Sequence, residues 1–320
     1  MQPRAGQTAS TDIPALPWSP GHRSGYVAVA GAPNVGKSTL INAYLGEKIA
    51  IVSPKPQTTR HRVLGILTRD DAQVIFVDTP GLHRPSNRLG DYMVEVAREA
   101  LKDSDAILWL VDAAQPPGSA DEAVAQALSE VPETATALVL NKTDLVEPAL
   151  MEEREAAYRH LAPVHACFRT SATVGTGLDQ LLSWVISELP EGPRYYPADQ
   201  IAEREERFFT AELIREQILH HLRQEVPHSI AVTVDEFKER PNGVAYIAAT
   251  LYVEKESQKG IVIGAGGGTL KRVSIDARRE IERFLGRPVY LELWVKVRRN
   301  WRRNEARLRE LGYRVARRAN

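Results

Sequence analysis

The sequence predicts two domains, an α/β domain with a doubly wound, mostly parallel sheet and a smaller α+β domain after it. Three observations support this fold class. The chain has 320 residues, which exceeds a typical single domain. In its first part, short apolar runs alternate with helical patterns, as in parallel strands joined by crossover helices. A proline-rich break at residues 190–197 then leads into a segment with a different order of elements.

The first part of the chain supplies the elements of the doubly wound sheet. Its apolar runs are short, as in buried parallel strands, and helical patterns lie between them. Ligands of such sheets bind outside the carboxyl ends of the strands, so we expect site residues in the loops that follow the strands. We predict strands at residues 26–30, 74–77, 106–111, 136–140 and 167–170, and helices at 39–45, 92–102, 121–129 and 178–189.

The second part reads as α-β-β-α-β with a basic helix after it. Pro227 is expected to end its first helix, and Pro241-Asn242-Gly243 is a turn signal between two strands. The predicted segments are a helix at 203–225, strands at 229–237 and 244–254, a helix at 269–285, a strand at 289–297 and a basic helix at 301–311. The predicted domain boundaries are a mobile tail at 1–24, the α/β domain at 25–190, a linker at 191–202 and the second domain at 203–320.

The composition limits the possible functions and locations. The chain balances 41 basic against 41 acidic residues, but residues 255–320 hold 18 Lys or Arg against 7 Asp or Glu, a net charge of +11. This split favours a nucleic-acid partner for the second domain. Cys167 is the only cysteine, which excludes an intrachain disulfide and suits a reducing compartment. We find neither a membrane span nor a signal peptide and expect a cytoplasmic protein.

The segment from Gly31 to Ser38 matches the phosphate-binding loop pattern G-x-x-x-x-G-K-S. It follows a predicted strand and precedes a predicted helix, the context that the pattern requires. Its glycines let backbone N–H groups wrap phosphates, and the helix dipole favours the anion. Lys37 is expected to bridge the β and γ phosphates, and the Ser38 hydroxyl to hold Mg²⁺. The nucleotide-binding residues expected here are Gly31, Ala32, Pro33, Asn34, Val35, Gly36, Lys37, Ser38 and Thr39.

A D-x-x-G segment follows the apolar run at residues 74–77. Its Asp78 lies at a strand end and can reach the Mg²⁺ shell, and the Gly81 N–H can meet the γ-phosphate. A lone D-x-x-G also fits an ordinary turn, but its place on the next clear strand after the phosphate loop favours the nucleotide site. The residues expected at the site are Asp78, Thr79, Pro80 and Gly81.

Residues 53–62 lie between these two motifs and are predicted to be the first switch. Thr58 or Thr59 can offer a hydroxyl to Mg²⁺ and the γ-phosphate, and we favour Thr59. The alternative is an ordinary polar loop, which the neighbouring motifs disfavour.

Two further segments predict recognition of guanine. The Asp144 carboxylate can accept hydrogen bonds from N1–H and the exocyclic amine of guanine, which adenine does not present in that arrangement. A buried carboxylate without its donors costs about 1 to 3 kcal/mol, so we expect ATP to be rejected. The Ala172 N–H is placed to meet guanine O6. The residues are Asn141, Lys142, Asp144, Ser171 and Ala172, and with the phosphate loop they indicate a P-loop GTPase.

These residues together resemble the Era family of bacterial ribosome-assembly GTPases. The runs that carry the resemblance are 31–39, 56–60, 78–83 and 141–144, and it extends over residues 25–315. Der GTPases carry two such domains in tandem and MnmE GTPases place theirs inside a larger helical protein, so both fit less well. The resemblance implies a monomer with a type II KH domain of the order α-β-β-α-α-β. It also implies Mg²⁺ as cofactor and the 3′ end of 16S ribosomal RNA in the 30S subunit as partner.

Within that resemblance, residues 262–267 lie where a KH domain keeps its G-x-x-G loop. Gly264 and Gly267 would let the backbone approach sugar-phosphate, and the following helix dipole favours phosphate. KH loops commonly carry a Lys here, whereas this chain has Ala265 and Gly266, so backbone contacts must contribute more. The RNA-binding residues expected are Gly264, Ala265, Gly266 and Gly267, with Lys259, Lys271 and Arg272 as the nearest charges.

The catalytic residues are less clear than the binding residues. Ras-like GTPases orient the attacking water with a Gln after D-x-x-G, but this chain has Leu82 there, so slow intrinsic turnover is expected. His83 is a less favoured substitute. Asn34 stands where similar potassium-activated GTPases hold K⁺ beside the phosphates. The catalytic residues expected are Lys37, Thr59, Gly81 and Asn34.

Two alternative readings remain open. In one, the chain is an RNA-binding assembly factor in which GTP is mainly a structural or regulatory ligand, since Leu82 replaces the water-orienting Gln. In the other, the basic C-terminal segment associates peripherally with the cytoplasmic face of the inner membrane. Trp294, Trp301 and the arginines nearby fit either an RNA-binding surface or a solvated helix.

Overall fold

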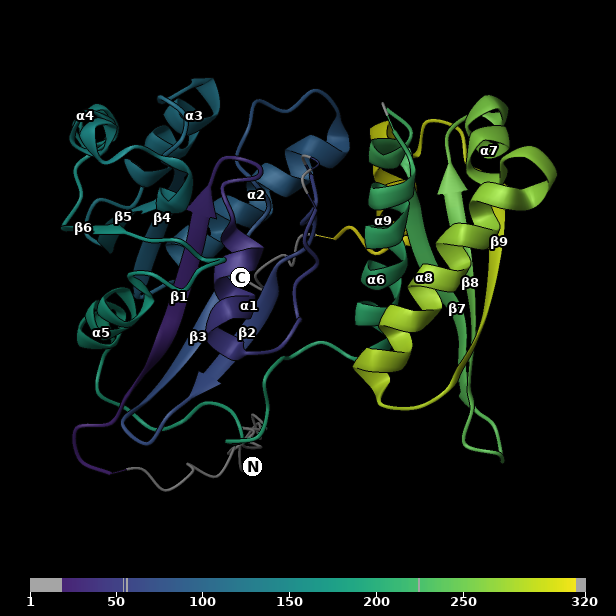
Figure 1. Cartoon of the computed structure of the whole chain (residues 1–320), viewed down its shortest axis with the longest axis horizontal. Helices are drawn as coiled ribbons and strands as arrows, with labels where there is room; N and C mark the ends of the chain where they lie inside the picture. The colour runs from purple at the N-terminus through teal and green to yellow at the C-terminus, as the bar shows by residue number, and fades with distance from the viewer. Residues whose placement is uncertain (1–18, 54, 56, 224, 315–320) are drawn as a thin grey trace, which may run out of the picture.

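The computed structural model describes residues 19–314 except positions 54, 56 and 224, and it contains two domains side by side (Figure 1). The first domain is built on a six-stranded sheet and the second on a three-stranded sheet. Among the residues described, no helix is both long and apolar enough to cross a membrane. Of the tail predicted at residues 1–24, residues 1–18 lie outside the described part of the chain. The prediction was wrong for its end, because Arg23 and Ser24 already belong to β1 and pair with β3.

The first domain contains a doubly wound sheet in the strand order β2-β3-β1-β4-β5-β6. Five of its strands are parallel, and β2 pairs antiparallel with β3 at one edge. The strands are β1 (Arg23–Gly31), β2 (Val63–Thr68), β3 (Ala72–Asp78), β4 (Ala106–Asp112), β5 (Ala135–Asn141) and β6 (Ala166–Arg169). The helices are α1 (Lys37–Leu45), α2 (Arg88–Lys102), α3 (Ser119–Leu128), α4 (Pro148–Arg159) and α5 (Leu178–Glu188).

Helices cover both faces of this sheet, because side chains of successive strand residues point to opposite faces. Val27 and Val29 of β1 pack in the cluster that contains residues of α1 and α5. Ala28 and Ala30 belong to the cluster that contains residues of α2, α3 and α4. The loops after β1, β3, β5 and β6 therefore meet at one edge of the sheet, where the predicted motifs lie.

The second domain has the order α-β-β-α-α-β that the family resemblance implies. Strand β8 lies centrally, antiparallel to β7 and parallel to β9. Helices α6 and α8 pack against each other over one face of the sheet, around a shared apolar core. The elements are α6 (Glu206–His221), β7 (Ala231–Glu239), β8 (Ala245–Val253), α7 (Glu256–Ile263), α8 (Gly268–Leu285), β9 (Val289–Val297) and α9 (Glu305–Glu310).

Three elements were not predicted from the residues, one helix ends earlier than predicted, and one predicted helix is divided into two shorter elements. The missed elements are β2, α4 and α7, so the residue-based order of the second domain lacked one helix. Helix α6 ends at His221, and Pro227 instead opens a short 3-10 turn. The expected basic helix at 301–311 is a 3-10 turn at Trp301–Arg303 followed by the short α9.

The predicted linker is fastened along the first domain. The Ile66 N–H donates to the Ile201 carbonyl at 2.9 Å. The Gln73 side chain accepts from the N–H groups of Tyr195 and Tyr196 at 2.7 and 2.9 Å. The linker therefore runs along the β2 edge of the sheet as far as Ala202.

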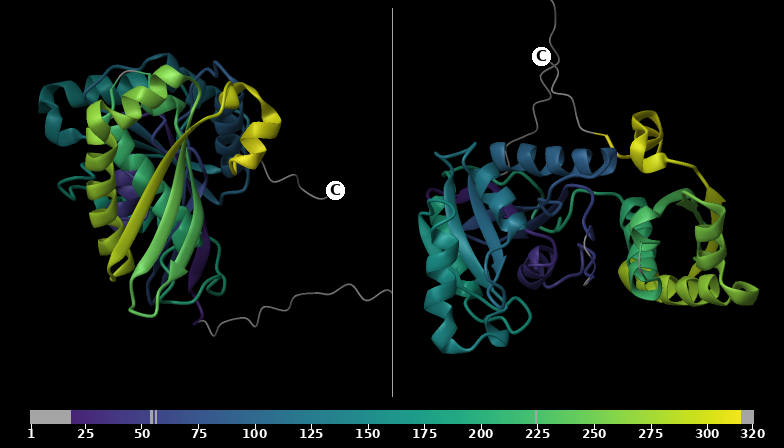
Figure 2. Two further views of the ribbon diagram at one scale, coloured as in Figure 1. Left: turned by 90° about the vertical axis from the view of Figure 1, so that its right-hand side faces the viewer. Right: turned by 90° about the horizontal axis from the view of Figure 1, so that it is seen from above.

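The two domains also meet through the C-terminal segment. In the right-hand view of Figure 2 this segment (yellow) reaches from the second domain toward α2 (blue). One buried cluster contains residues of α2, such as Tyr92 and Met93, together with Trp301, Leu308 and Tyr313. The C-terminal segment therefore packs against both domains.

Candidate functional site

The phosphate loop (residues 31–38) runs from the end of β1 into the first turn of α1. The Lys37 ammonium donates to the carbonyls of Gly31 and Ala32 at 3.1 and 2.8 Å, so the loop wraps its own lysine. Burial lowers the pKa of Lys37 to about 8, against the attraction of Asp78. The loop therefore holds a largely desolvated cation next to α1's N-terminal N–H groups, the arrangement that binds a polyphosphate.

Three oxygen atoms from three different elements converge beside this lysine. The Ser38 hydroxyl donates to Asp78 Oδ2 at 2.8 Å, and the Thr59 hydroxyl lies 3.1 Å from both Ser38 Oγ and Asp78 Oδ2. Thr58 instead donates to the Lys55 carbonyl at 2.6 Å. The structure therefore brings Thr59, and not Thr58, to the expected metal position.

This oxygen cluster fits Mg²⁺. Asp78 Oδ1 is buried without a hydrogen-bond partner, and burial raises the pKa of Asp78 to about 6. A bound cation would give Asp78 Oδ1 a partner, and its charge would lower the pKa of the carboxyl group again. One carboxylate with hydroxyls is also the donor set that Mg²⁺ uses beside nucleotide phosphates. No cluster of three or more His, Cys, Asp or Glu suited to a metal occurs among the described residues, which does not bear on a site of this kind.

The D-x-x-G segment packs tightly against the phosphate loop. A Cβ at Gly81 would lie 2.9 Å from the Pro33 nitrogen, so only glycine fits there. The Leu82 side chain is 2% exposed and packs in the core cluster that contains α2 and β4 residues. The His83 ring nitrogen Nδ1 forms a hydrogen bond with the Gly81 carbonyl oxygen at 2.9 Å. The position of the water-orienting Gln in Ras-like GTPases is thus a core residue here.

The base-specific segments are tied together by Asn141. Its amide donates to the Val35 carbonyl at 2.8 Å, and its Oδ1 accepts from the Ala172 N–H at 3.0 Å. One side chain therefore links the phosphate loop to the loop after β6. Because the Ala172 N–H already has an acceptor, its bond to guanine O6 stays a prediction.

The remaining base-side residues lie in the loops after β5 and β6, with Asp144 on the 3-10 turn Thr143–Leu145. The Lys142 ammonium pairs with Asp112 at 2.7 Å, a partner that no sequence motif predicts. Asp144 is exposed, as a carboxylate that must meet a ligand edge would be. Ser171 is buried, and its hydroxyl lies 3.2 Å from that of Thr173. The guanine-recognition segments therefore meet at the same edge as the phosphate loop.

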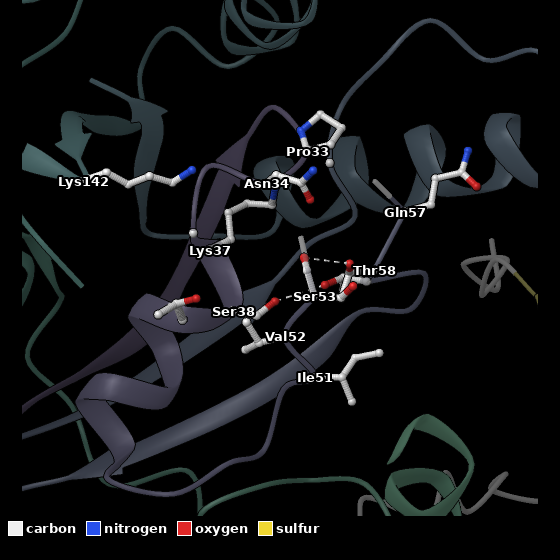
Figure 3. Close-up of a pocket in the computed structure, with 14 residues that line it drawn as sticks. Pro33, Asn34, Lys37, Ser38, Ile51, Val52, Ser53, Gln57, Thr58 and Lys142 are labelled. Carbon is white, nitrogen blue, oxygen red and sulfur yellow. Dashed lines mark hydrogen bonds between the residues drawn. The ribbon is translucent and has the colours of Figure 1, made fainter. Parts of the chain in front are cut away.

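A cavity of about 330 Å³ follows this edge from the phosphate loop to the first switch, with Lys142 at one end and Gln57 at the other (Figure 3). Its walls combine the phosphate loop, the first switch, Gly81 and Lys142. Asn34 is exposed into it from a left-handed backbone conformation, with φ of 66°. The lining residues are Pro33, Asn34, Gly36, Lys37, Ser38, Thr39, Ile51, Val52, Ser53, Gln57, Thr58, Thr59, Gly81 and Lys142.

The KH loop (residues 264–267) connects α7 to α8. Gly264 has φ of +74°, and a Cβ there would meet Thr269 Oγ1 at 2.3 Å. Ala265 and Gly266 are exposed, and Gly266 and Gly267 have open space around them. The loop therefore presents bare backbone at the start of an 18-residue helix. Lys271 and Arg272 are exposed in the first turns of that helix, and Lys259 is half-buried on α7.

The aromatic and basic residues of β9 and of the segment after it divide into two groups. Trp301 is fully buried and donates to the Ser229 carbonyl at 2.9 Å, which makes it a core residue and not an RNA-stacking one. Arg302 pairs with Glu254 at 2.6 Å. Trp294 is 56% exposed on the outer face of the sheet. Only Trp294 of these residues retains an open ring.

The residues that join the first switch to the second domain were not predicted from the sequence. Arg60 and Arg215 are fully buried at this contact, and Lys55 and Glu216 also bridge it. They carry no motif, and their partners are more than 150 residues away in the chain. Only the positions of the two domains bring them together.

Fold and site together define a P-loop GTPase joined to a KH domain. A family model described as a 50S ribosome-binding GTPase matches residues 26–142, and one described as a KH domain matches residues 225–302. The chain is 40% identical to a variant of Aquifex aeolicus Era solved with GDP and AlF4-, with a TM-score of 0.87 over 92% of this chain and 100% of that one. An Era structure in complex with MgGDPNP and nucleotides 1506–1542 of 16S ribosomal RNA gives 40% identity, the same coverage and a TM-score of 0.88.

The chain therefore belongs to the Era family, and it is a GTPase. The order of elements in the second domain and the residues of the nucleotide site agree with this assignment.

Proposed function

We propose that this chain is a GTP-dependent switch that binds the 3′ end of 16S ribosomal RNA through its KH domain and acts in assembly of the 30S subunit. The observation that carries the proposal is the joining of a complete nucleotide site to the KH domain through the first switch, which contributes Thr59 to the site and Arg60 to the interdomain contact. The Era structure that contains a 16S ribosomal RNA fragment supports this choice of RNA.

In the GTPase reaction, each residue of the site has a role that its position supports. Lys37 binds the β and γ phosphates, and the Gly81 N–H meets the γ-phosphate. Ser38, Asp78 and Thr59 would hold Mg²⁺, which neutralises charge on the phosphates when bound. Asp144 selects guanine, and Asn141 holds the loops at the two ends of the nucleotide in register. Since Leu82 is buried, water positioning falls to other groups.

We also propose that Asn34 ligates K⁺ beside the phosphates. Its exposed side chain on the cavity wall supports this role. A monovalent cation there would stabilise negative charge that develops on the phosphates, as an arginine finger does. We expect faster GTP hydrolysis in KCl than in NaCl at equal ionic strength, and loss of that difference in Asn34→Ala. Equal rates in the two salts for the unaltered chain would overturn this part of the proposal.

The test of the main proposal is GTP turnover with and without an RNA oligonucleotide that carries the 3′ end of 16S ribosomal RNA. We expect turnover in both conditions and a change in rate when RNA binds. Absence of turnover in both conditions would favour the alternative in which GTP serves mainly as a structural or regulatory ligand. An RNA of the same length and scrambled sequence is the control for charge alone.

The proposal places the protein in the cytoplasm as a monomer, with peripheral association at the inner membrane as a secondary property. Cys167 is the only cysteine, which supports the cytoplasmic location. The net charge of +11 over residues 255–320 supports the association with the membrane. Co-sedimentation with anionic vesicles at physiological salt tests the membrane part. Recovery of the protein in the supernatant would overturn it.

A further inference from the structure

The first switch is fastened to the KH domain by charged side chains. Just before it, the Val52 N–H donates to Glu216 Oε1 at 2.9 Å. The Lys55 ammonium donates to the carbonyls of Leu219, in the last turn of α6, and of Leu222, its C-cap, where a helix dipole favours a cation. The contacts between the domains therefore involve the same segment that reaches the metal position.

Arg215 of α6 makes the contact nearest to the nucleotide. Its side chain is 1% exposed and forms an ion pair with Glu212 one turn earlier. The two terminal nitrogens of its guanidinium donate to two successive carbonyls of the first switch, those of Gln57 (3.4 Å) and Thr58. A guanidinium is rigid and planar, so these bonds fix the orientation of the backbone that they contact.

The backbone at this contact needs such support. Gln57 has φ of 61°, a left-handed conformation that few residues other than glycine adopt. A conformation of this kind persists only when its surroundings hold it. Arg215 binds the carbonyls of two successive peptides, those on either side of the Thr58 Cα, and thus holds the kink that leads into Thr59.

Arg60 fixes the other side of Thr59. Its side chain is fully buried, and it donates to the carbonyls of Ile230 and His228 at 2.7 and 3.0 Å. Thr59 therefore lies between two points that the KH domain holds, and its hydroxyl lies 3.1 Å from both Ser38 Oγ and Asp78 Oδ2.

We propose that Arg215, although it belongs to the KH domain, is a positioning residue for GTP hydrolysis. It acts through the carbonyls of Gln57 and Thr58 to place the Thr59 hydroxyl at the Mg²⁺ and γ-phosphate position. This inference rests on the proposed role of Thr59. One consequence follows from linkage: if RNA binding displaces α6, it changes the affinity for GTP by the same factor by which GTP changes the affinity for RNA.

The test uses Arg215→Lys in the full chain. Lysine keeps a cation beside Glu212, but its single ammonium cannot hold two successive carbonyls in a fixed plane. We expect the affinity for a non-hydrolysable GTP analogue to fall about 10-fold and kcat to fall by a similar factor. The affinity for GDP should stay within about twofold, because GDP lacks the γ-phosphate that Thr59 meets.

A second variant and a matched control separate positioning from a general loss of structure. Glu212→Gln combined with Arg215→Met removes both charges, so no buried carboxylate is left unpaired. It should give the same selective loss of GTP-analogue affinity. Glu206→Gln removes a 2.9 Å ion pair with Arg287 at the other end of α6, leaves Arg287 paired with Glu239, and should leave both affinities unchanged.

Thr59→Val distinguishes failure of the inference from failure of the proposed function. If Thr59→Val leaves the preference for the GTP analogue over GDP unchanged, the proposed role of Thr59 fails, and the inference fails with it. If Thr59→Val lowers that preference while both Arg215 variants retain it, the inference alone is overturned. An equal loss of GTP-analogue and GDP affinity in the Arg215 variants would also overturn it, because that result indicates a structural role.

Discussion

The phosphate loop and the KH loop have a similar backbone arrangement in different surroundings. Both are glycine-rich and lead directly into a helix, α1 in one domain and α8 in the other. In the phosphate loop, Lys37 and Ser38 are buried and Asn141 braces the backbone at 2.8 Å. In the KH loop, Ala265 and Gly266 are exposed and have no charged neighbour in the loop itself.

The difference shows how one device, a helix N-terminus with bare backbone, serves two purposes. A buried charge acts through a low effective dielectric, so the phosphate loop can bind a small anion tightly and orient it for a reaction. An exposed loop supplies fewer and weaker contacts, and its affinity depends on nearby Lys and Arg and therefore on salt. Substitutions in the two loops should differ accordingly in the size of their effects.

The largest effect is expected for Lys37→Ala. Removing one partner of a buried, hydrogen-bonded charge pair costs several kcal/mol, so we expect GTP affinity to fall about 1000-fold. RNA affinity of the nucleotide-free chain should be unchanged, since the KH loop lies in the other domain. Titration calorimetry with GTP and with RNA measures both, and Lys102→Ala, an exposed lysine of α2, is the control. A small effect on GTP would mean that backbone groups alone hold the phosphates.

The second-largest effect is expected at the residue that recognises the guanine base. Asp144→Ala removes the acceptor for two guanine donors, and we expect GTP affinity to fall about 10- to 100-fold. ATP affinity should not fall, because adenine does not use this carboxylate. Competition of GTP and ATP against a fluorescent guanine nucleotide measures the change. A parallel loss for both nucleotides would contradict the assignment of Asp144 to guanine.

In the KH loop, Gly267→Asp is expected to lower RNA affinity about 10-fold. The substitution places a negative charge and a side chain where sugar-phosphate is proposed to approach, and φ of +79° also strains it. Gly286→Asp is the matched control, because Gly286 ends the same helix with φ of +65° and open space around it. GTP turnover should be normal in both variants. Equal RNA affinity in the two would exclude the KH loop from the RNA site.

The smallest effects are expected for the charges beside that loop. Lys271→Ala and Arg272→Ala should each weaken RNA binding a few-fold at physiological salt. Each should also reduce the slope of log affinity against log salt by about 1, as loss of one phosphate contact does. Arg278→Ala, farther along α8, should leave that slope unchanged. If all three variants keep the slope, phosphate binding must occur elsewhere on the basic domain.

The sequence predicts a site best where one contiguous motif carries the chemistry. The phosphate loop and Asn141–Asp144 could be located because each combines a fixed spacing with a strand in front of it. The five parallel strands could be located for a similar reason, since buried strands are continuous apolar runs. Strand β2 was missed because it lies at the sheet edge, contains Gly65 and ends in half-buried residues. Helix α7 was missed because it is short and buries only Val262.

The rest depends on the way that distant segments pack. Leu82 was recognised as a departure from the Ras-like pattern, but its burial in the core required the structure. The sequence alone does not separate the two roles of Trp301, because an aromatic residue among arginines fits an RNA-binding surface and a core equally well, whereas the structure buries it. The contact of Arg215 with the Thr58 carbonyl joins residues 157 positions apart, which no local pattern reports.

The attachment of the linker to β2 and β3 determines how the domains can move. Because Ile201 is hydrogen-bonded to Ile66 and Ala202 forms a bridge with Gly65, only residues 203–205 remain between the last backbone contact with the sheet and the start of α6. A connection this short keeps the start of α6 close to the sheet edge in every arrangement of the two domains. We therefore expect the KH domain to turn about this corner of the GTPase domain in a rearrangement that releases the contacts of the first switch and of the C-terminal segment.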